Sequence, residues 1–256
     1  MAGEKGQKKR FWSVEDPTLS PRNRQLATIC TAARGTSLAL TAHAGLSPNA
    51  LTDVNRHEAR MQRLTPLQIT LSNETPGGEV QTLIADADKR AEIISGLRGE
   101  DRIPGFVSSQ GLIAWRFLQS VRSHVGPREQ RFCEWGSGVG IVSCLAAQQG
   151  WTSVGIEIEP RLVAEARSLA DRHGLAVRFV EGSYKPPAFF EQYAPATSFN
   201  IADGVGLFDA DVIFIYAWPA ERDSVTEAIA RHAAPGTVFM RYGGGVTCDA
   251  FRVGVS

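Results

Sequence analysis

The stretch of residues 131–159 constrains the fold more than any other part of this chain of 256 residues. A short apolar run leads into Glu134, and an apolar run with helical spacing ends before Gly150. Between these runs, three glycines alternate with other residues: Gly136, Gly138 and Gly140. A second β-type run then delivers Glu157. Strand, glycine turn, helix and strand in this order predict part of a doubly wound sheet of mainly parallel strands.

The glycine turn is suited to hold a ligand, and its spacing separates two kinds of nucleotide. Glycines lack a Cβ, so backbone N–H groups at a helix N-terminus can approach a bound molecule. An acid at the end of the next strand, here Glu157, is placed to accept hydrogen bonds from a ribose. A dinucleotide fingerprint requires G-x-G-x-x-G, but position 141 is isoleucine and Glu134 precedes the turn. An NAD(P)-dependent oxidoreductase therefore remains only an alternative.

The motif E-W-G-S-G-V-G, followed by G-I-E-I-E-P, resembles motif I and the acidic loop of class I S-adenosylmethionine-dependent methyltransferases. The resemblance covers residues 104–245 and implies S-adenosylmethionine as the cofactor. In that family the glycine turn carries the methionine part and the second-strand acid holds the ribose. The family often has an acid for the adenine amino group where Ser183 stands, which leaves this contact to a backbone amide or to Ser183. The cofactor contacts that the resemblance implies are Glu134, Gly136, Ser137, Gly138, Gly140, Glu157, Ile158, Gly182 and Ser183.

The remaining sequence predicts a Rossmann-like α/β domain at residues 78–256. Apolar stripes predict helices at about 78–97, 109–121, 160–173 and 221–233. The first two helices precede the first strand, and Phe106 to Ser109 between them either touch the ligand or only cap a helix. Further strands are expected at about 176–180, 212–217, 237–242 and 247–253. Right-handed crossovers give five parallel strands the order 3-2-1-4-5, with at most one or two short strands after them. Residues 1–77 show no sustained periodicity and are expected to be a disordered or loosely attached extension.

Composition and charge exclude several classes of protein. Lys+Arg and Asp+Glu both total 27, so no overall basic excess indicates nucleic acid. No apolar run approaches the length of a membrane span. The four cysteines form no C-x-x-C pair and have no histidines at ligand spacing, so we expect no metal site. Free thiols are typical of the reducing cytosol, which predicts a cytoplasmic protein. The oligomeric state is left open.

The methyl acceptor is the feature that the sequence specifies least. The fourth strand ends in Tyr-Ala-Trp-Pro, where amino-group methyltransferases carry Asn-Pro-Pro-Tyr, and this departure argues against a nucleic-acid base. Aromatic side chains are expected to border the methyl-transfer side: Phe189, Phe190, Tyr193, Tyr216 and Trp218. Such a border suits a small molecule of apolar or cationic character. The glycine turn also resembles that of a group of protein lysine methyltransferases, so a protein amine is the second choice.

Catalytic residues are not specified by any motif. Methyl transfer from a sulfonium requires alignment and exclusion of water, and it can proceed without a protein base. The ionisable candidates for a base are Tyr216, Glu221 and Tyr242, although packing explains the two tyrosines and a helix dipole explains Glu221 equally well. A non-catalytic module that binds adenosylmethionine, or serves as an interaction platform, remains a third interpretation.

Overall fold

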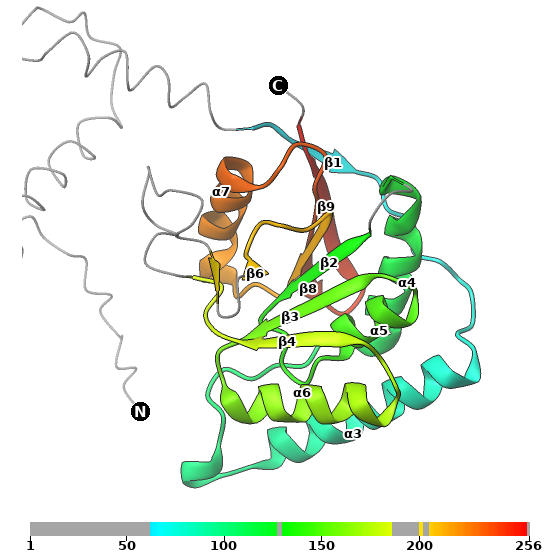
Figure 1. The fold of residues 1–256 in the computed structure, drawn as a ribbon, viewed down its shortest axis with the longest axis vertical. Coiled ribbons are helices and arrows are strands. Elements are labelled where there is room, and N and C mark those ends of the chain that lie inside the picture. The colour runs from blue at the N-terminus through cyan, green and yellow to red at the C-terminus, as the bar shows by residue number, and fades with distance from the viewer. Residues whose placement is uncertain (1–61, 127–129, 186–199, 202–204, 255–256) are drawn as a thin grey trace, which may run out of the picture. The chain divides into compact units, whose positions relative to one another are not determined.

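The computed structural model describes residues 62–126, 130–185, 200–201 and 205–254 (Figure 1). Residues 1–61, which make up most of the expected N-terminal extension, lie outside the described residues. The predicted aromatic border residues Phe189, Phe190 and Tyr193 also lie outside them.

Five parallel strands lie side by side in a seven-stranded sheet and extend from one of its edges. They are β2 (Arg131–Trp135), β3 (Thr152–Glu157), β4 (Val177–Glu181), β7 (Val212–Ile215) and β8 (Val238–Gly244). Their order across the sheet is β4-β3-β2-β7-β8, which confirms the predicted order 3-2-1-4-5. The reversal between β2 and β7 places a topological switch point beside the glycine turn, where such sheets bind ligands.

Helices cover both faces of this sheet. One face carries α3 (Gly78–Gly96), α4 (Gly111–Val121), α5 (Ile141–Gln148) and α6 (Pro160–Arg172), and the other carries α7 (Arg222–His232) (Figure 1). Short 3-10 turns lie at Gly99–Asp101 (η1), Arg122–His124 (η2) and Pro219–Glu221 (η6). The amphipathic α6 shows why these helices form: Pro160 starts it, and its apolar stripe is buried against the sheet.

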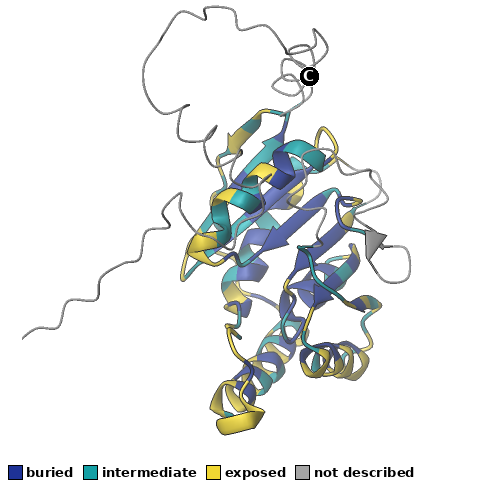
Figure 2. Ribbon diagram, turned by 90° about the vertical axis from the view of Figure 1, so that its left-hand side faces the viewer, coloured by how far each residue is buried: buried dark blue, intermediate teal, exposed yellow. Residues whose placement is uncertain are grey.

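The strands are buried between the two helix layers, whereas the exposed residues gather on the outer helix faces (Figure 2). In β7 all four residues are buried, as expected for a central parallel strand. A separate antiparallel pair is formed by β5 (Asn200–Ile201) and β6 (Val205–Gly206).

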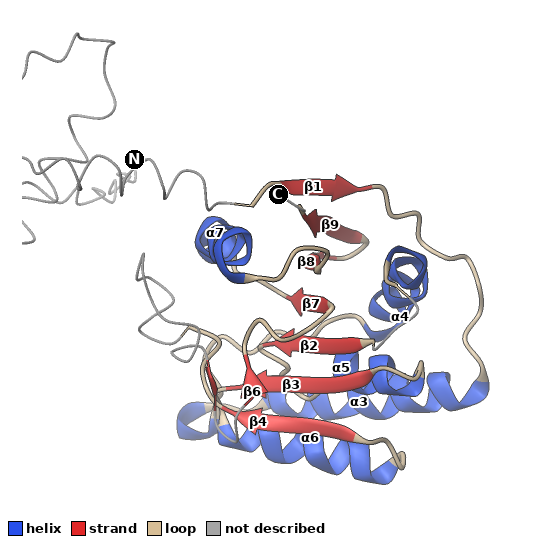
Figure 3. Ribbon diagram, turned by 45° about the horizontal axis from the view of Figure 1, so that its top comes forward, coloured by secondary structure: helices blue, strands red, loops and turns tan. Residues whose placement is uncertain are grey.

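Two strands that are antiparallel to each other complete the sheet beyond β8 (Figure 3). One is β9 (Thr247–Val253), which pairs antiparallel with β8 and confirms the strand expected at about 247–253, within the one or two short C-terminal strands that the sequence allows. The other is β1 (Leu64–Leu67), which pairs antiparallel with β9 and forms the edge. The expected domain start at residue 78 is therefore wrong for this segment. β1 contains Pro66, which lacks an N–H donor and is tolerated because the strand lies at an edge.

Candidate functional site

The glycine turn between β2 and α5 has a left-handed backbone conformation that residues with a side chain rarely adopt. All three glycines have positive φ: 73° at Gly136, 53° at Gly138 and 82° at Gly140. A Cβ at Gly140 would lie 2.6 Å from Cζ of Phe179 and 2.8 Å from Cβ of Ala166. Glycine at 140 is thus required both by the left-handed backbone and by the close packing of the turn against β4 and α6.

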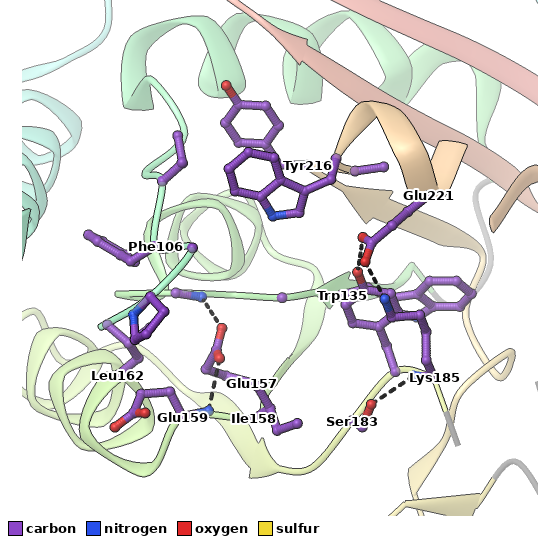
Figure 4. Close-up of a pocket in the computed structure, with 18 of the residues that line it drawn as sticks. Phe106, Trp135, Glu157, Ile158, Glu159, Leu162, Ser183, Lys185, Tyr216 and Glu221 are labelled. Atoms are coloured by element: carbon purple, nitrogen blue, oxygen red, sulfur yellow. Dashed lines mark hydrogen bonds and ion pairs between the residues drawn. The ribbon is translucent and has the colours of Figure 1, made fainter. Parts of the chain in front are cut away.

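Glu157, at the end of β3, faces this turn. Its Oε2 accepts the backbone N–H of Gly138 at 2.9 Å, and its Oε1 accepts the N–H of Glu159 at 3.0 Å (Figure 4). The residue is 8% exposed. Because each carboxylate oxygen has two lone pairs, both can accept a further hydrogen bond from a ligand hydroxyl. Glu157 therefore lies where the sequence placed it, beside the glycine turn and open to a cavity.

Glu134 has a different position from the one expected. It is 3% exposed and its Oε2 accepts both the N–H and the Oγ–H of Ser143, at 2.8 and 2.6 Å. Burial raises the pKa of Glu134 to about 8, and the neighbouring Glu157 charge also raises it, whereas the bonds from Ser143 lower it. Unlike the other acid expected to contact the cofactor, Glu157, the Glu134 side chain does not line the cavity and instead binds the first turn of α5.

A cavity of about 600 Å³ opens at the carboxyl ends of the parallel strands. Five of the predicted cofactor residues line it: Gly136, Gly138, Glu157, Ile158 and Ser183. Ile158 is 68% exposed, so the cavity offers an uncovered aliphatic face beside the Glu157 carboxylate (Figure 4). Besides Glu134, three predicted residues do not line the cavity: Ser137, Gly140 and Gly182. These three shape the backbone around it; Gly182, for example, donates its N–H to the carbonyl of Glu157 at 2.9 Å.

Aromatic rings from four segments surround the cavity. They are Phe106, Trp135, Tyr184, Tyr216 and Trp218. The ring of Phe106 lies over the glycine turn, since a Cβ at Gly138 would be 3.2 Å from its Cε2. Residues 103–107, between η1 and α4, thus form one wall, as one of the two interpretations of the Phe106 segment expected. Tyr216 and Trp218, two of the aromatic residues expected to border the methyl-transfer side, line the cavity just after the end of β7.

A polar cluster of Tyr184, Lys185 and Glu221 crosses one end of the cavity, and no sequence motif indicates that these side chains meet. Tyr184 donates its hydroxyl to Oε2 of Glu221 at 2.8 Å, and Lys185 forms an ion pair with Oε1 of the same carboxylate (Figure 4). The Tyr184 ring also stacks on Trp135, with centroids 5.8 Å apart and planes at 14°. Burial, together with the bond to Glu221, raises the pKa of the Tyr184 hydroxyl far above its usual value. The cluster joins the loop after β4 to η6.

The three candidates for a catalytic base have different surroundings. Tyr216 lines the cavity, and its ring packs edge-on against Tyr242 at 4.9 Å. Tyr242 is 1% exposed and donates to the carbonyl of Gly245 at 2.9 Å, so it is a packing residue and does not line the cavity. Glu221 lines the cavity, but both of its oxygens are engaged by Tyr184 and Lys185. Two of the three candidates, Tyr216 and Glu221, therefore line the cavity, and of these only Glu221 has its oxygens engaged by neighbouring side chains.

None of the residues that line this cavity is a cysteine. Cys133 and Cys144 are buried free thiols, and burial raises the pKa of each to about 12. Within the described residues, no group of three or more His, Cys, Asp and Glu side chains could hold a metal ion. The helices of that same part of the chain include none with the length and apolar character needed to cross a membrane.

Comparisons with known proteins find partial similarity to several methyltransferases. No family model matches the chain. Over 66 residues it is 30% identical to the ribosomal protein L11 methyltransferase of Thermus thermophilus, a match that spans only 26% of each chain. An SAH-bound methyltransferase of Podospora anserina shares 13% identity and a TM-score of 0.42, covering 79% of this chain and 73% of that one.

An RNA methyltransferase of Salinibacter ruber, in complex with S-adenosyl-L-homocysteine, shares 18% identity with a TM-score of 0.36. That similarity covers 70% of this chain and 92% of the other. All three proteins are methyltransferases, the class that the glycine turn and Glu157 predicted. The Rossmann-like α/β fold class is likewise as predicted, with the N-terminal edge strand β1 as the addition.

Proposed function

We propose that this chain is an S-adenosylmethionine-dependent methyltransferase. The observation that supports this best is the position of Glu157, whose carboxylate accepts the N–H of Gly138 at 2.9 Å while both residues line one cavity. A buried carboxylate beside a glycine turn suits the hydroxyl pair of a ribose, because charge-assisted hydrogen bonds to hydroxyls are strong. In this proposal Glu157 holds the ribose, and Gly136 and Gly138 accommodate the methionine part.

The surroundings of Glu157 fit the adenine ring of the same cofactor. Ile158 offers an exposed aliphatic face on which a flat base can pack. Oγ of Ser183 accepts the N–H of Lys185 at 3.0 Å, and its own O–H has no acceptor among the described residues. In the proposal that O–H donates to a ring nitrogen of adenine, which replaces the acid that the methyltransferase family often has there.

The helix N-terminus distinguishes this cofactor from a dinucleotide. A dinucleotide places its pyrophosphate against the free N–H groups at the start of the helix after the glycine turn. In this chain the Glu134 carboxyl group occupies that turn and accepts the N–H of Ser143 at 2.8 Å. Adenosylmethionine carries no phosphate and has no need of this position. The oxidoreductase alternative is accordingly disfavoured by Glu134 as well as by Ile141.

Bound adenosylmethionine would supply an electrophilic methyl group on a sulfonium. The chain's own part in the reaction is to align the acceptor and exclude water, which the aromatic walls of the cavity are suited to do. Tyr216 is the residue that we propose as a base where the acceptor must lose a proton. For the acceptor we propose a small molecule, with a protein amine as the second choice.

Calorimetry with adenosylmethionine, adenosylhomocysteine, NAD⁺ and NADP⁺ tests the proposal. We expect the two adenosyl compounds to bind and the dinucleotides not to bind. Glu157→Gln should weaken the binding of both adenosyl compounds. Its matched control is Glu159→Gln, since Glu159 also lines the cavity but pairs with Arg161 at 2.9 Å and should not be needed for the ribose. Binding of NAD⁺ or NADP⁺ alone would establish the oxidoreductase instead.

Transfer itself is tested with methyl-labelled cofactor and separate pools of metabolites, tRNA and cell protein. We expect label in the metabolite pool. Cofactor binding without label in any pool would favour the non-catalytic module, and label in the tRNA pool alone would refute the small-molecule acceptor.

A further inference from the structure

Most of the charged side chains that line the cavity already have a hydrogen-bond or ion-pair partner. Lys185 pairs with Glu221, and Glu159 pairs with Arg161. Glu157 accepts two backbone N–H groups and is assigned to the ribose in the proposed function. One charged side chain of the cavity remains without a role, and it is Arg222.

Arg222 is the first residue of α7 and is half-buried. Its Nε is buried without a hydrogen-bond partner, and its guanidinium forms no ion pair with any described residue. A buried N–H without an acceptor costs free energy, and a guanidinium has the planar fork that matches a carboxylate. Arg222 is therefore a cation of the cavity whose counterion is not found among the described residues.

An uncovered aromatic ring lies on the same segment, four residues before Arg222. Trp218 lines the cavity and is 51% exposed, and its Cζ2 lies 4.0 Å from the position of a Cβ on Gly105. Tyr216 lines the cavity two residues earlier. The end of β7 and η6 thus present two aromatic rings and one unpaired cation to the same space. On this segment the carboxylate that lines the cavity is Glu221, and both of its oxygens are already engaged by Tyr184 and Lys185.

We propose that the methyl acceptor is a small aromatic acid whose carboxylate binds Arg222 and whose ring packs against Trp218. This inference rests on the proposed methyltransferase function and specifies its substrate class. It replaces the cationic acceptor considered from the sequence, because the free charge on this side of the cavity is positive. The carboxylate of adenosylmethionine has the same chemistry, so the test must separate the two sources.

The test uses the full-length protein loaded with adenosylhomocysteine and three probes of equal size and different charge. They are 4-hydroxybenzoate, the neutral 4-hydroxybenzamide and the cationic tyramine, titrated by calorimetry or ligand-observed NMR. We expect 4-hydroxybenzoate to bind at least ~10-fold more tightly than the other two, as a charge-assisted bidentate pair requires. Arg222→Met should abolish this preference, and Arg222→Lys should keep part of it.

Arg231→Met is the matched control, because Arg231 lies on the same helix but pairs with Glu227 and does not line the cavity. It should keep the preference for the carboxylate, and thermal unfolding should show all three variants folded. Equal binding of benzoate and benzamide, or no binding of either, would overturn the inference.

Loss of adenosylhomocysteine affinity in Arg222→Met would also overturn it, by assigning Arg222 to the cofactor. Failure of the wild-type protein to bind adenosylhomocysteine is a different result, which refutes the proposed function. The probe titrations on the unloaded protein would then still show whether Arg222 selects a carboxylate.

Discussion

The backbone N–H of Gly138 donates to the carboxylate of Glu157 at 2.9 Å, so the glycine turn after β2 is tied directly to the end of β3. The two residues are distant in sequence, and the parallel pairing of β2 with β3 brings them together. One carboxylate therefore fixes the turn and also faces the cavity. The geometry of the turn and the binding of a ribose are expected to depend on the same side chain.

Glu157→Ala is expected to weaken adenosylmethionine binding by about 1–3 kcal/mol, the cost of losing charge-assisted hydrogen bonds to buried hydroxyls. Glu157→Gln should lose less, because the amide oxygen can still accept the N–H of Gly138. Calorimetry measures both affinities, and a thermal unfolding curve shows how far the turn itself is affected. An unchanged affinity in Glu157→Ala would mean that other residues hold the ribose.

Gly140→Ala is expected to destabilise the protein more than Gly150→Ala does. Both glycines have positive φ, 82° and 86°, so each alanine has a left-handed backbone cost of about 1–2 kcal/mol. Only at Gly140 does the new Cβ meet other atoms, 2.6 Å from Phe179, whereas nothing lies within 4 Å at Gly150. Overpacking adds about 1–3 kcal/mol. Urea denaturation gives the two free energies of unfolding, and equal losses would contradict the packing argument.

The centre of the fold could be predicted because local signals there agree with the tertiary structure. Apolar runs marked the parallel strands, the alternation of strands and helices gave their order, and Glu157 followed from its place at a strand end. The position of Glu134 away from the cavity has a simple physical cause. Side chains alternate along a strand, and in β2 Glu134 faces α5 whereas Trp135 faces the other layer and the cavity.

The remaining features depend on contacts between distant segments, which a single sequence does not reveal. β1 has only four residues and contains Pro66, so it carries no strand signal of its own. It forms a strand because it pairs with the edge of β9 that β8 leaves open, where Leu64 lies opposite Val253. The bond from Tyr184 to Glu221 likewise joins loops that follow different strands. Sequence reasoning could identify Glu221 as a helix-start acid but could not supply its partners.

A pair of truncations separates residues 1–60 from β1. Deletion of 1–60 is expected to preserve adenosylmethionine binding, because the strands and helices of the domain lie within 62–254. Deletion of 1–70 also removes β1 and its pairing with β9, and with it the burial of Leu64 and Leu67. We expect a loss of about 2–4 kcal/mol in the free energy of unfolding, roughly 4–16 °C in Tm. Equal Tm values for the two truncations would show that the edge strand contributes nothing.

Glu134 is expected to make the stability of the protein depend on pH. The folded protein retains the proton of this carboxyl group up to about pH 8, whereas the unfolded chain releases it near pH 4.5. Between these values the folded state binds more protons, so the free energy of unfolding falls as the pH rises. The stabilisation is fully present below pH 4.5 and is lost by about pH 8, a decline on the order of a few kcal/mol.

Glu134→Gln keeps an oxygen that can accept both hydrogen bonds from Ser143 but has no proton to release. Its free energy of unfolding should therefore change less between pH 5 and pH 8.5 than that of the wild-type protein, as measured by urea denaturation at several pH values. The control is Glu92→Gln on the exposed face of α3, which should follow the wild-type curve because its carboxyl group is already in water. If the two variants show the same pH dependence, then the buried carboxyl group at the start of α5 is not the group that titrates.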